Sequence, residues 1–218
     1  MKVTVIGAGN MGSAFVKQLV LAGHEVSVTA RDSAKAAQVA AAHPGAKAVA
    51  VAGAANGADA VVLATGYGDA TAALQAVGDL QGKVVIDITN PLTADYMGLT
   101  LGHSSSAAEE IAKAVPGAEV VKAFNTVFAQ VLNEGADFGH DRKVSVFVAS
   151  DSARAKQTAA ALAQSMGFEV VDAGGLKNAR YLEPVAGFNI YLGYGAGLGT
   201  AIAPAWMTNC AASGMSMK

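Results

Sequence analysis

The first thirteen residues of the chain constrain its fold more than any other stretch. A short β-branched run at residues 3–6 leads directly into Gly7-Ala-Gly-Asn-Met-Gly12, and a helical pattern begins at Ser13. This is the pattern G-x-G-x-x-G placed between a strand and a helix, the setting in which it predicts dinucleotide binding. An ordinary glycine-rich turn is the alternative, and the flanking strand and helix disfavour it.

Each glycine of this pattern has a separate expected role. Gly7 permits the tight turn, Gly9 lets a pyrophosphate approach the backbone, and Gly12 lets the helix pack closely on the strand. The N–H groups of Asn10 and Met11 would face the phosphates at the positive end of the helix. All five residues are therefore candidate cofactor-binding positions.

The end of the second expected strand, residues 24–30, indicates which dinucleotide is bound. An NAD site requires a carboxylate about 20 residues beyond the motif, to accept a hydrogen bond from the ribose 2′-hydroxyl. Here the strand ends at Ala30, Arg31 follows, and Lys35 lies one helical turn further on. Two cations suit a 2′-phosphate, and Asp32 is better explained as the N-cap of the next helix. The sequence therefore favours NADP(H) over NAD(H).

Strand and helix patterns alternate through most of the remaining chain. This predicts an α/β fold of the Rossmann type, a doubly wound and mainly parallel sheet with a small C-terminal helical segment that serves the acceptor site. We expect residues 1–150 to form the NADP(H)-binding domain, and residues 151–218 to form an acceptor-binding and dimerisation segment. Within the first of these, Ser104 or Ser105 is expected to cap a helix that Glu109 opens. Further expected strands lie at 46–51, 59–64, 83–88, 119–123, 143–149 and 169–172, and further helices at 33–42, 69–77 and 152–166.

Three loops follow strands at the edge where open α/β sheets bind ligands. We expect them to converge beside the nicotinamide, with Asn125 and Thr126 positioning the reacting rings. The sequence offers no acid–base constellation, and the alternative for Asn125 is that it only caps a short helix ending near Gln130. The candidate residues of these loops are Thr65, Gly66, Asn90, Pro91, Asn125, Thr126 and Val127.

The segment from residue 180 to 189 is expected to form a roof over this crevice, with Pro184, Ala186 and Asn189 facing the acceptor together with Val127. Beyond it, a helical pattern with many glycines continues to Trp206. Glycines cost roughly 1 kcal/mol each in an exposed helix, so another surface must pack close to this backbone. The pattern predicts a two-fold homodimer.

Composition excludes several classes of function. A net charge of −2 gives no reason to expect nucleic acid or an anionic membrane as a partner. The single Cys210 and four scattered histidines predict neither a disulfide within the chain nor a metal site. Because no apolar run reaches about 18 residues and a strand begins at residue 2, we expect a soluble, cytoplasmic protein that acts on a small molecule.

Five stretches of the chain carry a family resemblance: 5–12, 29–31, 122–126, 172–176 and 179–180. They resemble motifs of the NADPH-dependent reductases of the deazaflavin coenzyme F420, and of the related NADPH-binding domain of the STEAP metalloreductases. The resemblance covers nearly the whole chain and implies hydride transfer between NADPH and a flavin-like ring. It places Arg31 and Lys35 at the positions of the 2′-phosphate ligands.

The chain also departs from that family. F420-using members carry a histidine at the position of Asn125, and hydroxyl side chains at the positions of Pro184 and Ala186. Asn125 is instead the residue of the STEAP-like domains, which use an ordinary flavin, so FMN and FAD stand beside F420 as candidate acceptors. The alternative functions are a dehydrogenase of a small carbonyl or imine compound, with Lys177 or Tyr181 as the acid, and a non-enzymatic NADP(H) sensor.

Overall fold

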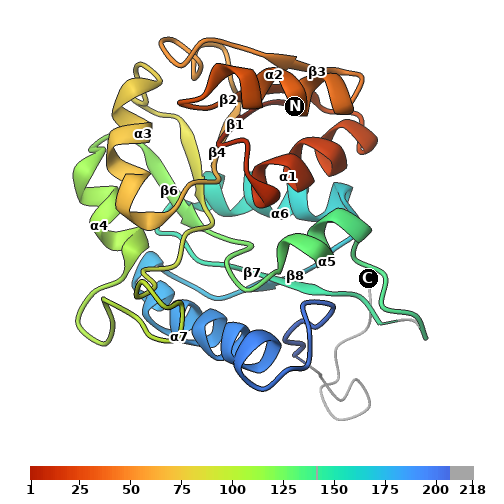
Figure 1. The fold of residues 1–218 in the computed structure, drawn as a ribbon. Helices are drawn as coiled ribbons and strands as arrows, with labels where there is room; N and C mark the ends of the chain where they lie inside the picture. The colour runs from red at the N-terminus through yellow and green to blue at the C-terminus, as the bar shows by residue number, and fades with distance from the viewer. Residues whose placement is uncertain (141, 207–218) are drawn as a thin grey trace.

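A computed structural model describes residues 1–140 and 142–206 of the chain. Residues 207–218, which include Cys210 and the end of the predicted segment 151–218, lie outside the described residues. The elements follow one another in Figure 1 as β1 (Lys2–Ile6), α1 (Asn10–Leu21), β2 (Glu25–Thr29), α2 (Ser33–Ala42), β3 (Ala46–Ala48), β4 (Ala60–Leu63), a 3₁₀ turn (Tyr67–Asp69), α3 (Ala70–Ala76), β5 (Val84–Asp87), α4 (Ala107–Ala114), β6 (Glu119–Lys122), α5 (Ala129–Glu134), β7 (Ser145–Val148), α6 (Ala153–Ser165), β8 (Glu169–Asp172), a 3₁₀ turn (Leu176–Asn178), α7 (Ala179–Ile190) and a π-helical turn (Tyr191–Gly195).

Six parallel strands form the main sheet in the order β3-β2-β1-β4-β5-β6. The order reverses between β1 and β4, which makes this the topological switch point of a doubly wound fold. The predicted fold class is confirmed. None of the described helices is both long and apolar enough to cross a membrane.

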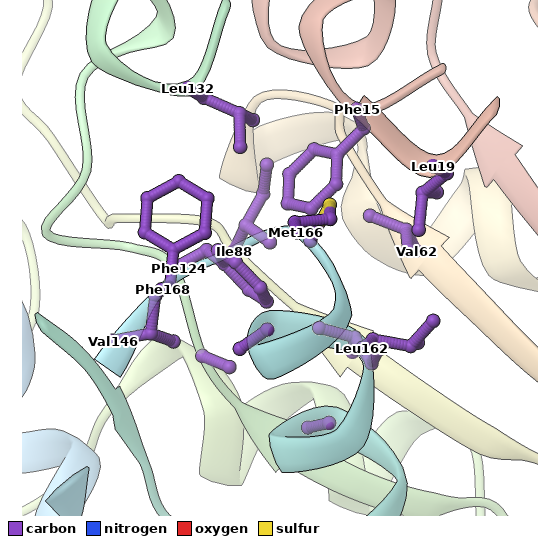
Figure 2. Close-up of a cluster of buried hydrophobic side chains, with 14 of the residues drawn as sticks. Phe15, Leu19, Val62, Ile88, Phe124, Leu132, Val146, Leu162, Met166 and Phe168 are labelled. Atoms are coloured by element: carbon purple, nitrogen blue, oxygen red, sulfur yellow. The ribbon is translucent and has the colours of Figure 1, made fainter. Parts of the chain in front are cut away.

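The central strands are apolar because both faces of the sheet are covered. Every residue of β4 and β5 is buried, as is usual for strands in the middle of a parallel sheet. On one face, α1, α5 and α6 pack around Phe15, Leu132 and Leu162 in the cluster that Figure 2 shows. On the other face, α3 and α4 pack Leu74 and Ile111 against the sheet.

A second, two-stranded parallel sheet, β7 and β8, lies beside the main one. It joins β6 at a single antiparallel bridge, where the backbone groups of Lys122 and Ala149 exchange two hydrogen bonds of 2.9 and 3.0 Å. Helix α7, blue in Figure 1, follows β8 and contacts α4. The C-terminal part of the chain is thereby tied to the far edge of the main sheet.

Two local predictions are corrected by the structure. Helix α4 is capped by Ser106, whose Oγ accepts from the N–H of Glu109 at 3.2 Å, and not by Ser104 or Ser105. The hydroxyl of Ser105 is instead donated to the carboxylate of Glu110.

The second correction concerns the C-terminal segment, because the helix predicted to run on toward Trp206 ends at Ile190. From residue 196 to residue 206, the last one that the structure describes, the chain has no regular structure, and Gly197 and Gly199 have φ angles of 75° and 78°. Residues with such left-handed φ angles cannot be part of a right-handed helix. The two glycines therefore prevent the helix from resuming after the π-helical turn.

Candidate functional site

The glycine-rich turn between β1 and α1 is shaped by steric contacts at two of its three glycines. Gly7 has φ of 118°, and a Cβ placed there would lie 2.2 Å from the carbonyl oxygen of Ala64, the residue after β4. A Cβ at Gly12 would lie 1.9 Å from the carbonyl oxygen of Gly7. At Gly9, by contrast, an added Cβ meets nothing within 4 Å. The first and third glycines are thus required by packing, while the second borders open space.

Helix α1 presents its N-terminus to that space. Its N-cap is Gly9, which supplies no side-chain cap, and the helix begins at Asn10. The first N–H groups of a helix have no partner inside it, and they carry the positive end of the helix dipole. The turn therefore fits a phosphate group, and it has the geometry that the motif predicted.

Two cavities meet at this turn. The first has a volume of about 780 Å³ and the second of about 750 Å³. Five residues line both cavities, because the two adjoin at the turn. Together they form one continuous trough across the switch point. The shared residues are Gly9, Asn10, Ala64, Thr65 and Gly66.

The second cavity holds the residues predicted to select the dinucleotide. Arg31 and Lys35 line it together with Asp69. The guanidinium of Arg31 donates to both carboxylate oxygens of Asp69 at 3.2 and 3.1 Å, although the two side chains are 86% and 51% exposed. Sequence reasoning missed Asp69, which lies in the 3₁₀ turn after β4. Exposed ion pairs of this kind are weak, so Arg31 can be released to another anion.

Asp32 has the local role that the sequence indicated. Its Oδ1 accepts from the N–H groups of Ala34 and Lys35 at 3.0 and 3.3 Å, which caps helix α2. The capping prediction is confirmed, and the carboxylate is engaged with the helix.

Asn125 lies at the centre of a hydrogen-bond network in the first cavity. Its Nδ2 donates to Asn90 Oδ1 and to the carbonyl oxygen of Leu182 on α7, both at 3.0 Å. Asn90 Nδ2 donates in return to the carbonyl oxygen of Asn125 at 2.9 Å. Asn189, also on α7, donates to the carbonyl oxygen of Thr126 at 3.1 Å. The loops after β5 and β6 and helix α7 are thereby held together, as the sequence predicted for this crevice.

The alternative role considered for Asn125 is wrong. The short helix α5 begins at Ala129 with Phe128 as its N-cap, and no side chain caps it. Asn125 Oδ1 and Thr126 Oγ1 are buried without a hydrogen-bond partner among the described residues. Both residues line the first cavity. Their two side-chain oxygens do not cap α5, so they stay free to form hydrogen bonds with a ligand at the cavity wall.

The backbone at Phe124 explains how Asn125 and Thr126 reach that wall. Phe124 has φ of 57°, a left-handed conformation that costs a non-glycine residue roughly 1–2 kcal/mol. Its ring is buried edge-to-face against Phe15 and Phe168, with centroids 5.0 and 5.9 Å apart (Figure 2). Burial of the ring offsets the strain, and the turn directs the next two residues over the sheet edge.

Directly beside this wall lies a buried charge cluster that sequence reasoning missed. Lys122 Nζ lies 2.7 Å from Asp87 Oδ2 and 2.8 Å from Glu183 Oε1, and none of the three side chains is more than 1% exposed. Asp87 and Lys122 are register partners on β5 and β6. A signal was present, since the carboxyl end of each of the two strands carries a charged residue between apolar neighbours.

Backbone donors complete the cluster. Glu183 on α7 accepts from the N–H groups of Ala107 and Ala108 at 2.9 and 3.2 Å, at the start of α4. Asp87 Oδ1 accepts from the N–H of Thr89 at 2.8 Å, and Lys122 Nζ donates to the carbonyl oxygen of Thr89 at 2.6 Å. The carboxylates receive only donors, which is the environment of the ionised form.

Tyr67 connects this cluster with the cavity. It lines the first cavity after β4. Burial raises the pKa of its phenol, and the negative charges of Glu110, Glu183 and Asp87 raise that pKa further. Glu183 and Asp87 belong to the cluster, and its third member, Lys122, lowers the pKa of the same phenol.

Most predicted site residues line one cavity or the other, but three do not. Gly12 is buried beneath the turn, Pro91 is buried after β5, and Pro184 is on the exposed side of α7. On α7 the inward positions are Ala186 and Asn189, which do line the first cavity. Lining residues that the sequence did not indicate include Tyr96, Met97, Ile190 and Tyr194.

The residues proposed for other chemistry are not at this site. Lys177 and Tyr181 line neither cavity, and the side chain of Tyr181 is 72% exposed. Within residues 1–140 and 142–206, no group of three or more histidine, cysteine, aspartate or glutamate side chains could hold a metal ion.

Comparison with known proteins relates this architecture to nicotinamide-dependent reductases. Residues 2–91 match the family model described as NADP oxidoreductase, coenzyme F420-dependent. The chain is 31% identical over 202 residues to the F420-dependent NADP reductase of Methanothermobacter marburgensis, which covers 85% of this chain and 89% of that protein. A crystal structure from Arthrobacter sp. FB24, provisionally assigned as an F420-dependent NADP reductase, superposes with a TM-score of 0.82 at 34% identity and covers 92% of this chain and 96% of that one.

A second group of relatives is larger. The metalloreductase STEAP3 of Rattus norvegicus is 30% identical over 185 residues, which covers 84% of this chain but only 36% of that protein. The chain therefore spans about a third of the length of that relative.

Proposed function

The chain belongs to the family of coenzyme F420-dependent NADP oxidoreductases, and on that premise we propose that it transfers a hydride between NADP(H) and a flavin-like ring. The dinucleotide would lie along the trough, with its pyrophosphate at the glycine turn. The flavin-like acceptor would occupy the remainder of the first cavity. Residues 1–150 would serve NADP(H), and the segment from residue 151 onward would complete the acceptor site.

One observation carries this proposal: two cavities of similar volume join at the N-terminus of α1. A helix N-terminus beside a tight glycine turn favours a phosphate group. The trough extends from there in both directions, which suits a dinucleotide whose two halves diverge from a central pyrophosphate. Open space at Gly9 and steric contact at Gly7 and Gly12 fit this use of the turn.

The second cavity would hold the adenosine half, with a phosphate on its ribose. Arg31 and Lys35 provide two cations there, and Asp32 is engaged in capping α2. A guanidinium can both stack on adenine and form paired hydrogen bonds with phosphate. The site would therefore select NADP(H).

The first cavity would hold the nicotinamide and the acceptor ring in contact. Hydride transfer between such rings depends on close alignment, with the chemistry itself supplied by the cofactors. Asn125 Oδ1 and Thr126 Oγ1 would bind polar edges of the rings, since both atoms are buried without a partner among the described residues. Val127 and Ala186 would supply apolar walls, and Asn189 would hold the Thr126 backbone in place.

The acceptor could be FMN, FAD or F420, and residues 125 and 186 bear on the choice. An amide at Asn125 and a methyl group at Ala186 provide fewer polar contacts than the histidine and hydroxyl of F420-using enzymes. We therefore expect an ordinary flavin to be reduced as well as F420, or better.

The protein would act as a homodimer. Large aromatic side chains on the outer side of α7 and the following turn are exposed, which is unusual for a monomer. They are Tyr181, Phe188 and Tyr191. A two-fold axis beside α7 would bury them against their copies in a second subunit.

The experiment that tests the proposed function is an acceptor screen. Loss of NADPH absorbance is followed by stopped flow with FMN, FAD, F420 and a panel of carbonyl and imine compounds. We expect rapid oxidation with at least one of the three flavin-like acceptors and none with the panel. Oxidation by the carbonyl or imine panel alone, or tight NADPH binding without any turnover, would refute the proposal.

A substitution at residue 125 sharpens the screen. Asn125→His should raise the rate with F420 relative to FMN, because it introduces the residue of F420-using enzymes beside the acceptor. Asn133→His on α5 is the matched control, since Asn133 is exposed and lines neither cavity. The same change in the F420-to-FMN ratio in both variants would contradict the assignment of Asn125 to the acceptor site.

A further inference from the structure

The buried cluster of Lys122, Asp87 and Glu183 carries more negative than positive charge. One ammonium faces two carboxylates, all at most 1% exposed, so the three ionised groups sum to −1. The N-terminus of α4, which donates to Glu183, contributes about half a positive charge. The balance remains negative, in a place where water does not screen it.

This charge lies immediately behind the proposed nicotinamide end of the trough. Thr89, whose backbone N–H and carbonyl oxygen are held by Asp87 and Lys122, lines the first cavity. Glu183 follows Leu182, whose carbonyl oxygen accepts from Asn125. Tyr67 also lines that cavity; the pKa of its phenol is raised first by burial and then by Glu110, Glu183 and Asp87, whereas Lys122 lowers it.

The oxidised and reduced forms of the cofactor differ in the charge of the nicotinamide ring. The negative charge of the cluster would act on this ring. When NADPH gives up a hydride, the neutral dihydronicotinamide becomes a positively charged nicotinamide, and the two electrons and the hydrogen pass to the acceptor. A fixed negative charge nearby stabilises the positive ring and leaves the neutral one almost unaffected.

We propose that the Asp87–Lys122–Glu183 cluster favours the oxidised form of the bound cofactor, and so makes bound NADPH a stronger hydride donor than it is in water. The inference rests on the proposed function, because it requires NADP(H) in the trough. The three residues act through space and are not expected to touch either ring. Their second role is to hold α7 against the sheet.

The test is the ratio of two dissociation constants, Kd for NADP⁺ over Kd for NADPH, measured by fluorescence titration and calorimetry in the absence of any acceptor. Glu183→Gln and Asp87→Asn each remove one negative charge. Each should weaken the binding of NADP⁺ relative to NADPH, and so raise the ratio about fourfold or more. This factor is expected when a unit charge of the cluster lies roughly 10 Å from the positive ring, at an effective dielectric constant of about 40.

Three control variants separate charge from structure. Glu183→Asp keeps the charge and should keep the ratio. The double variant Lys122→Met/Glu183→Gln breaks the ion pair but leaves the net charge at −1, so it too should stay within about twofold of the wild type. Glu25→Gln makes the same charge change at an exposed residue that lines neither cavity, and should have no effect.

The possible results discriminate clearly. The inference is overturned if both single variants keep the wild-type ratio, or if the double variant shifts it as far as Glu183→Gln does. It is also overturned if every variant of the cluster, Glu183→Asp included, loses its fold or its affinity for NADPH, because the cluster is then a purely structural element. If the wild-type protein binds neither form of the cofactor, the proposed function fails as well, which is a different outcome.

Discussion

Selection of NADP(H) by Arg31 can be tested through its ion pair with Asp69. To bind a 2′-phosphate, Arg31 must leave a carboxylate to which it donates two hydrogen bonds of 3.2 and 3.1 Å. An exposed pair of this kind is worth about 0.2–1 kcal/mol, whereas a hydrogen bond to a charged phosphate contributes about 1.5–3 kcal/mol. The net contribution of Arg31 to NADPH binding is then about 0.5–2.8 kcal/mol.

Two substitutions should therefore act in opposite directions. Arg31→Ala should weaken NADPH binding about 2- to 100-fold, which corresponds to that net free energy. Asp69→Asn should strengthen NADPH binding about 2- to 5-fold, because it removes both the competing partner and a charge that repels phosphate. Neither should change NADH binding by more than about twofold, since NADH lacks the phosphate.

Calorimetric titration of both variants with NADPH and NADH, at constant ionic strength, measures these effects. The double variant tests the coupling, because Asp69→Asn should matter less when Arg31 is absent. Asp79→Asn provides the control, since Asp79 is exposed and lines neither cavity. Equal losses of NADPH and NADH binding in Arg31→Ala, or weaker NADPH binding in Asp69→Asn, would refute the reasoning.

Three further outcomes are expected. Asn125→Ala should slow hydride transfer at saturating substrates by up to about 100-fold, because the rings lose their alignment; single-turnover rates check this, and an unchanged rate in the folded protein would contradict it. The hydrogen bond from Arg180 lowers the pKa of Glu109 below its ordinary value of 4.5. This pair therefore stabilises the folded protein at pH values above 4.5. The stabilisation is lost as the pH falls through the lowered pKa that Glu109 has in the folded protein. Arg180→Ala should accordingly lower Tm near neutral pH and have little effect in strong acid, and a constant loss at every pH would argue against the pair. Light scattering should give a dimer mass for the wild type and a monomer mass for the double variant Phe188→Glu/Tyr191→Glu, whereas a monomeric wild type at micromolar concentration would rule out the dimer.

The features that could be predicted from the sequence are mostly local ones. The turn from Gly7 to Gly12 needs a strand before it and a helix after it, and both can be recognised from short patterns. Asp32 was identified as a cap because its partners are the next residues along the chain. The resemblance to F420-dependent NADP reductases, drawn from motifs, is confirmed by relatives that cover most of the chain.

What the sequence did not show depends on contacts between distant segments. Asp69 pairs with Arg31 across 38 positions, and Glu183 reaches the start of α4 across 76. No periodicity indicates such partners. The direction of each α7 side chain was equally inaccessible, because it depends on how the helix docks. Pro184 was therefore assigned to the cavity, although the helix turns it outward.

The buried lysine beneath α7 also limits how the enzyme can open. Moving α7 away from the sheet as a rigid lid would separate Glu183 from Lys122 and leave charges unpaired in the interior, which costs about 3–5 kcal/mol. A hinge motion that moves α7 away from the main sheet would require this free energy in every catalytic cycle. Entry and release of the ring would then use segments in which no described residue forms an ion pair: Tyr96 and Met97 after β5, and Tyr194 beyond the end of α7. Turnover would be paced by small displacements of these side chains and their loops, and not by a domain movement.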